Sequence, residues 1–109
     1  MLSVLDDVAE IYEDTFKDKD TKKIWERNFL KKGLSPEIQK RAYKKLVPLL
    51  AFGYSLEEIE NFFGPKNFER LKGDRKGQCA IKVNEQYRIC FKWKDNRPYD
   101  IEFNKHYWD

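Results

Sequence analysis

In residues 70–94 the chain reads RLKGDRKGQCAIKVNEQYRICFKWK, and this stretch decides the fold. Apolar side chains recur at every second position on both sides of a short polar segment, which is the pattern of two half-buried antiparallel strands. Cations fill many alternate positions: the stretch holds eight of the chain's 22 Lys and Arg residues against two acids, Asp74 and Glu85. A sheet with one apolar face and one cationic face is suited to hold a polyanion.

The register of this hairpin follows from the need to bury its apolar residues together. Both strands present them on one face only if Ile81 lies opposite Ile89, which leaves residues 84–86 in the loop. The same register places Lys82 directly opposite Arg88 on the other face.

Two cations facing each other across a strand pair need a compensating group, because like charges at such positions destabilise a sheet. An anionic ligand is one explanation. Two alternatives remain open: Lys82 and Arg88 splay into water, or they pair with Asp100 or Glu102.

The two cysteines are expected to be structural. The register puts Cys79 on the core face and Cys90 on the opposite face, which argues against a disulfide between them. Two cysteines without a matching pair of histidines do not make a zinc site, so no metal is expected.

Length and composition indicate one globular domain. At 109 residues, with 40% hydrophobic and 16% aromatic residues, the chain can bury one modest core. No apolar run approaches the roughly 18 residues of a membrane span, and the acidic N-terminus is unlike a signal or transit peptide. We therefore expect a cytoplasmic protein with no membrane contact.

Charge is distributed unevenly along the chain. The net charge is +3, yet residues 1–16 carry −5 and residues 66–97 carry +6. This asymmetry favours an anionic partner for part of the surface, with a solvated mixed-charge surface as the alternative.

Helical spacing dominates the first 63 residues. The pattern predicts a short acidic helix over 2–12, a helix from an Asp20 N-cap to residue 32, and a helix that starts at a Ser35 N-cap. Pro48 is expected to kink or end that helix, and a further short helix is predicted over 55–63.

After Pro65 the apolar period changes from 3.6 to 2. Strands are predicted at 69–71, 78–83, 87–94 and 99–104, with a turn at 95–98 and a short early strand at 15–17. Helices followed by an antiparallel meander predict an α+β domain whose N-terminal helices pack on one face of a small antiparallel sheet. We place this domain at residues 15–109, after an acidic helical extension at 1–14.

Four blocks of the chain are similar, in order and spacing, to one protein family. They read FKDKDTKKIW (16–25), SPEIQKRAYKKL (35–46), LKGDRKGQ (71–78) and IKVNEQYRICFKW (81–93). Together they resemble the HigB branch of the RelE/ParE toxin superfamily, the plasmid maintenance killer proteins of type II toxin–antitoxin modules. The likeness covers about residues 16–107.

The resemblance implies a RelE-like fold and a defined chemistry. Such proteins are endoribonucleases, also called mRNA interferases, that enter the ribosomal A site and cut the mRNA without a metal or other cofactor. The ribose 2′-OH attacks the adjacent phosphate, which leaves a 2′,3′-cyclic phosphate and a 5′-OH end. A HigA-like helix-turn-helix antitoxin neutralises the toxin, and DNA is contacted only through that antitoxin.

The resemblance also implies catalytic roles for particular residues. Arg88 matches a family position linked to catalysis, and Lys72 matches the lysine of the LKGDR block. Relatives commonly end in Asp-Tyr-His, whereas here Tyr107 takes the histidine position and His106 lies one residue before it. Both are therefore candidates for proton transfer.

Further cations are expected to bind RNA. These are Arg75, Lys76, Lys82 and Lys92. Two of them, Arg75 and Lys82, are expected to converge with Lys72 and Arg88 on one phosphodiester, where fixed cations would stabilise the charge that builds during in-line attack.

Other functions stay open from the residues alone. The shifted histidine favours a non-catalytic RNA- or partner-binding module on the same fold. A basic DNA-binding subunit is disfavoured because no helix-turn-helix with a basic recognition helix is evident. For residues 1–14 the hypotheses are a helix that limits access of RNA, a dimer contact, or a frayed tail added by an upstream start codon.

Overall fold

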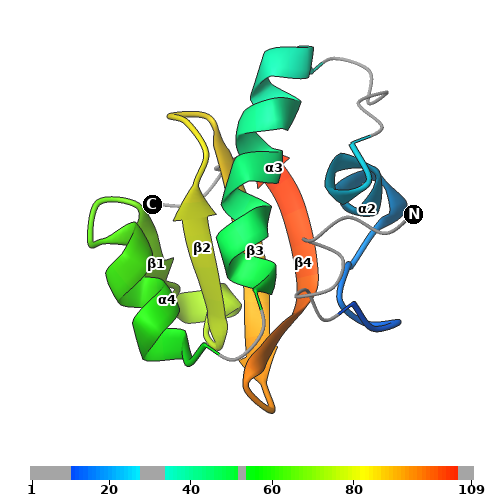
Figure 1. Ribbon diagram of the computed structural model, residues 1–109. Helices are drawn as coiled ribbons and strands as arrows, with labels where there is room; N and C mark the ends of the chain where they lie inside the picture. Colours follow the sequence, from blue (N-terminus) through cyan, green and yellow to red (C-terminus); the bar gives the residue numbers. More distant parts are fainter. Residues whose placement is uncertain (1–10, 28–33, 52–53, 106–109) are drawn as a thin grey trace.

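The computed structural model describes residues 11–27, 34–51 and 54–105, and it confirms the α+β architecture. The described helices are α2 (Lys19–Trp25), α3 (Pro36–Leu50) and α4 (Leu56–Phe63). They precede β1 (Phe68–Arg70), a 3-10 turn η1 (Gly73–Arg75), β2 (Gln78–Lys82), β3 (Tyr87–Lys94) and β4 (Arg97–Lys105). Figure 1 shows α3 lying across the sheet, with α2 and α4 at its two sides.

The sheet is an antiparallel meander in the order β1-β2-β3-β4. Ile81 pairs with Ile89 and Lys82 with Arg88, so the predicted hairpin register is confirmed. The early strand predicted at 15–17 is reduced to a single parallel bridge between Phe16 and Ile101.

The last strand begins two residues earlier than its predicted start at residue 99. Asp95 and Asn96 both adopt positive φ, 53° and 62°, which makes a tight two-residue hairpin turn. Pairing therefore continues to Lys94 opposite Arg97, and Pro98 lies within the strand and not in the turn.

One apolar core joins the helices to the sheet. All three described helices contribute to it, and its members from the sheet are Phe68 of β1 and the residues of alternating apolar character in β2, β3 and β4. Its fully buried side chains include Ile24, Leu46, Leu49, Ile81, Ile89, Phe91 and Ile101.

The helix ends follow local capping chemistry, with one correction. Ser35 accepts from the backbone N–H of Ile38 at 3.2 Å, as predicted for the start of α3. Asp18, and not Asp20, caps α2, because its carboxylate accepts from the N–H of Thr21 at 2.7 Å. The regular part of α2 ends at Trp25 and not at residue 32, and residues 28–33 lie outside the described part.

Pro48 is tolerated inside α3 because it lies in the last turn, where one backbone hydrogen bond is lost and the helix stops two residues later at Leu50. No helix among the described residues has the length and apolar character needed to cross a membrane.

Residues 11–17 run beside β4. Asp14 pairs with Arg97 at 2.8 Å, and the Arg97 guanidinium lies 4.3 Å from the centre of the Tyr12 ring. Residues 11 and 12 are not helical, and the remainder of the helix predicted at 2–12 lies outside the described residues. The boundary and the role assigned to residues 1–14 stay predictions.

Candidate functional site

The β2–β3 hairpin places two cations side by side on the face of the sheet that lies away from the helices. Lys82, at the end of β2, is the cross-strand neighbour of Arg88 in β3. Ile81 and Ile89, their neighbours in sequence, are fully buried against the helices on the other side. The sheet surface that carries Ala80, Lys82, Arg88, Cys90 and Glu102 is called the open face below.

Each of the two cations is compensated within its own hairpin. Lys82 Nζ lies 2.6 Å from Glu85 Oε1, and the Glu85 side chain is 86% exposed. Arg88 Nη1 donates to the backbone carbonyl of Asn84 and, at 3.0 Å, to that of Tyr87. These contacts aim the guanidinium, and they replace the pairing with Asp100 or Glu102 that was one alternative from the sequence.

A small cavity of about 220 Å³ opens beside this pair. Lys82 and Arg88 both line it, and the backbone between α4 and β1 supplies its opposite wall. Three polar residues also line the cavity: Lys66 and Asn67 from that wall, and Glu69 from β1. We call it the Lys82–Arg88 cavity.

Reasoning from the sequence missed these three residues. For Glu69 the strand predicted at 69–71 was a partial signal, but its place opposite Ala80 on the open face follows only from the observed pairing of β1 with β2. For Lys66 and Asn67, which precede the strand, no periodic pattern points to the cavity.

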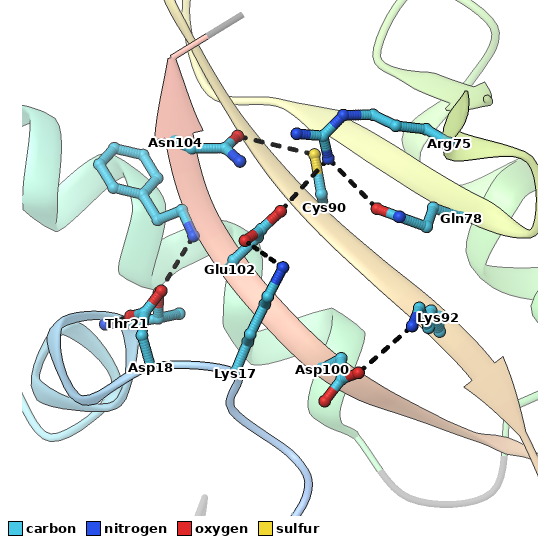
Figure 2. A network of polar contacts seen from close by, with 11 residues as sticks. Lys17, Asp18, Thr21, Arg75, Gln78, Cys90, Lys92, Asp100, Glu102 and Asn104 are labelled. Atoms are coloured by element: carbon cyan, nitrogen blue, oxygen red, sulfur yellow. Dashed lines mark hydrogen bonds and ion pairs between the residues drawn. The ribbon is translucent and has the colours of Figure 1, made fainter. Parts of the chain in front are cut away.

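Lys72 and Arg75 do not line this cavity. Arg75 lies over another part of the open face, where its Nη1 contacts Glu102 Oε1 at 3.2 Å and Gln78 Oε1 at 3.3 Å (Figure 2). The second oxygen of Glu102 pairs with Lys17 at 3.2 Å, and this carboxylate is only 13% exposed. Of the four cations expected to converge, the structure brings two into one cavity and holds Arg75 beside Glu102.

A small apolar cluster of Leu71, Ala80 and Cys90 lies on the open face. It anchors the segment 71–77 that joins β1 to β2 and contains η1, called the η1 loop below. Burial raises the pKa of the Cys90 thiol to about 12, although Arg75 pulls it down. Burial likewise raises the pKa of Cys79, in the main core, to about 11. The two thiols are free and lie on opposite faces, as predicted, and both stay protonated at neutral pH.

The remaining predicted residues lie apart from the cavity or outside the described part of the chain. Lys72 and Lys76 are exposed at the two ends of η1. Lys92 pairs with Asp100 at 3.4 Å, further along β3. His106 and Tyr107 lie outside the described residues. Within the described ranges no group of three or more His, Cys, Asp or Glu side chains could hold a metal ion.

Comparison with known proteins places these features in a family context. The family model described as RelE-like toxin of type II toxin-antitoxin system HigB matches residues 14–106. The chain is also 33% identical over 92 residues to Toxin HigB-1 of Vibrio cholerae serotype O1, which covers 84% of this chain and 94% of that protein. The family match, residues 14–106, spans α2, α3, α4 and all four strands of the sheet.

Proposed function

The chain belongs to the HigB-like toxins of type II toxin–antitoxin systems, and on this premise we propose that it is an endoribonuclease that cuts mRNA on the ribosome. The observation that carries the proposal is the Lys82–Arg88 cavity, in which three cations, Lys66, Lys82 and Arg88, and one carboxylate line a space of about 220 Å³. A cavity of this kind is suited to a single phosphodiester and its neighbouring ribose.

In the proposed reaction the 2′-oxygen of the ribose forms a bond to the adjacent phosphorus while the bond from phosphorus to the 5′-oxygen breaks. The products are a 2′,3′-cyclic phosphate and a 5′-OH end. Negative charge grows on the non-bridging oxygens, and Arg88 and Lys82 stabilise it from fixed positions. Side-chain cations balance this charge, so the proposed reaction is independent of metal ions.

Arg88 is the better placed of the two cations to act in this way. Its Nη1 donates to the carbonyl of Asn84 in the hairpin loop and to that of Tyr87 at the start of β3, and these contacts hold the guanidinium beside the cavity. Lys82 is bound to an exposed carboxylate, so an arriving phosphate must displace Glu85 to gain a full contact with the ammonium group. We therefore assign transition-state stabilisation mainly to Arg88.

Two proton transfers complete the reaction. A base must take the proton of the 2′-OH, and an acid must supply one to the 5′-oxygen. Glu69 is the carboxylate that lines the cavity, which makes it the base that the geometry favours. His106 and Tyr107 stay candidates for the acid, on the strength of the family pattern.

The path of the RNA beyond the scissile phosphate is assigned to cations along the open face. Arg75 is held near the sheet by Glu102, and Lys72 and Lys76 extend from the same loop. Lys92 continues the row along β3. These contacts would fix the strand without reading its bases.

The biological setting of the proposal follows from the family. The partner is a HigA-like antitoxin with a helix-turn-helix domain, and the toxin contacts DNA only through it. The mRNA is bound in the ribosomal A site, in the cytoplasm.

One observation favours a second candidate, a non-catalytic RNA- or partner-binding module. Lys82 is already engaged by Glu85, and Arg88 by the backbone carbonyls of Asn84 and Tyr87. Such a module would bind ribosomes without cutting mRNA.

The test is expression in a bacterium that lacks the antitoxin, with 5′ ends of cellular mRNA mapped by sequencing. The parent should arrest growth and produce new 5′-OH ends inside translated frames. Arg88→Ala should abolish both effects. Arg70→Ala is the matched control, because Arg70 lies on the same sheet with its partner Glu60 and does not line the cavity.

Arrest by Arg88→Ala as strong as that of the parent would contradict the site assignment. Ribosome binding without new 5′ ends would instead support the non-catalytic module.

A further inference from the structure

A second concave surface, distinct from the Lys82–Arg88 cavity but sharing Asn67 with it, lies between α3 and α4. It is a groove of about 680 Å³ whose basic side chains, Arg41, Lys44 and Lys45, all come from α3. Pro48 of α3 and Phe62 and Phe63 of α4 supply apolar lining. We call it the α3–α4 groove.

The groove combines positive charge with exposed apolar surface. Its lining, taken over the described residues, contains three bases and no carboxylate. Phe62 is 68% exposed, more than any other large hydrophobic side chain in the described ranges, and its ring stands edge-on to Phe63 at 5.2 Å. An aromatic side chain this exposed beside a hollow is typical of a surface that another molecule covers.

The apolar character extends beyond the cations. An adjoining hollow of about 360 Å³ shares Pro48 and Phe62 with the groove and adds Tyr54 and Ile59. Its one charged lining residue among those described is an acid, Glu58. The whole surface is therefore an apolar strip with bases at one end and a carboxylate at the other.

We propose that the α3–α4 groove binds an acidic amphipathic helix of the antitoxin that a type II toxin requires. An apolar stripe at helical spacing would cover Phe62 and Pro48, and acids on its flank would face Arg41 and Lys44. The proposal rests on the family membership and does not depend on ribonuclease activity.

An RNA strand fits this surface less well. A phosphate backbone would gain from the three bases of α3, and a base could stack on Phe62. Beyond Phe62, however, the strand would meet Tyr54, Ile59 and the Glu58 carboxylate, which repels phosphate. A helix with an apolar face matches the full length of the strip.

The groove also reaches the proposed active site. A hollow of about 380 Å³ lies next to it and is lined by Arg41, Lys45 and Lys82 together with Glu85, the carboxylate that pairs with Lys82. Asn67 lines this hollow, the α3–α4 groove and the Lys82–Arg88 cavity alike. Acids of a helix in the groove can therefore compete with Glu85 and with phosphate for Lys82, which would couple antitoxin binding to neutralisation.

The test measures binding of the antitoxin encoded in the toxin's own operon to purified toxin in an Arg88→Ala background. Phe62→Ser removes the exposed ring, and Lys44→Glu reverses one charge of the groove. Each is expected to weaken binding roughly tenfold or more. Lys23→Glu, the same charge reversal on an exposed position of α2, is the control and should bind like the parent.

Thermal melting of each variant, together with hydrogen exchange of the unsubstituted toxin, separates a binding effect from a folding effect. Antitoxin should protect the backbone amides of residues 41–50 and 56–63 from exchange whether or not any variant folds poorly. The proposal is overturned if both variants bind the antitoxin as tightly as the parent does and these segments show no protection from exchange.

Ribosome binding supplies a second discriminating measurement. If Phe62→Ser and Lys44→Glu keep full antitoxin affinity but bind ribosomes more weakly, the groove is an RNA surface and the proposal is wrong. With Arg88 intact and no antitoxin present, both variants should still arrest growth, which reports the toxin's activity separately from its neutralisation.

Discussion

The Cys90 thiol should make the protein less stable as the pH rises above 9, because it is buried beneath the η1 loop on the open face. Burial raises the pKa of this thiol from 9.0 to about 12, against the opposing effect of Arg75 and Arg88. A thiol exposed among the same cations would show the opposite sign, with a lowered pKa and a stability that increases with pH. The prediction therefore tests whether the open face is sealed beneath the loop.

The magnitude follows from proton linkage. The folded pKa of about 12 lies above the unfolded pKa of about 9, so the unfolded chain releases the proton first. The stabilising contribution is complete below pH 9 and is lost as the pH rises toward 12. Between pH 8 and pH 10 the unfolded thiol goes from about one-tenth to about nine-tenths ionised, and the free energy of unfolding falls by about 1.4 kcal/mol.

Urea unfolding under reducing conditions at pH 8 and pH 10 measures this change. The comparison is between Cys79→Ala and the double variant Cys79→Ala/Cys90→Ala, so that all other titrating groups cancel. The stability advantage of the chain that retains Cys90 should shrink by about 1.4 kcal/mol between the two pH values. If the stability advantage of the chain that retains Cys90 stays constant or increases with pH, the thiol is not buried as described.

Two further predictions concern the link between α2 and the sheet and the proposed base. The buried Thr21 hydroxyl accepts from the backbone N–H of Phe103 at 3.0 Å, so Thr21→Val should lower the free energy of unfolding by about 1–3 kcal/mol in urea titrations. Thr21→Ser keeps the hydroxyl and should lower the free energy of unfolding by less. If both variants lower it equally, the hydrogen bond is not the cause. Glu69→Gln should slow mRNA cleavage on purified ribosomes about 100-fold or more while ribosome binding stays unchanged. Cleavage at the parent rate would exclude Glu69 as the base.

Most of the sheet could be predicted because the information is local. The alternation of apolar and polar residues in β2 and β3 admits one register that buries both apolar sets, and that register puts Lys82 beside Arg88. The Ser35 and Ser55 caps are equally local, since each uses a hydrogen bond to a residue three positions along the chain.

The parts that could not be predicted depend on pairings between distant segments. The carboxylate that faces Arg75 comes from Glu102, which is 27 residues further along the chain. Its position over Arg75 requires both the β3–β4 pairing and the folding of the η1 loop onto Leu71 and Cys90. No periodic pattern in the sequence contains that contact.

The sequence by itself determined an α+β chain with a cationic hairpin, because a period of two and a short loop leave one way to bury the apolar side chains. Only the tertiary structure decided which groups share the cavity with Lys82 and Arg88. Lys66, Asn67 and Glu69 enter it because β1 pairs along the edge of β2, whereas Arg75 pairs with the partly buried carboxylate of Glu102 elsewhere on the same face. The physical reason is that alternation sets the face on which a side chain lies, while the neighbour it meets there depends on how separate strands and loops come together.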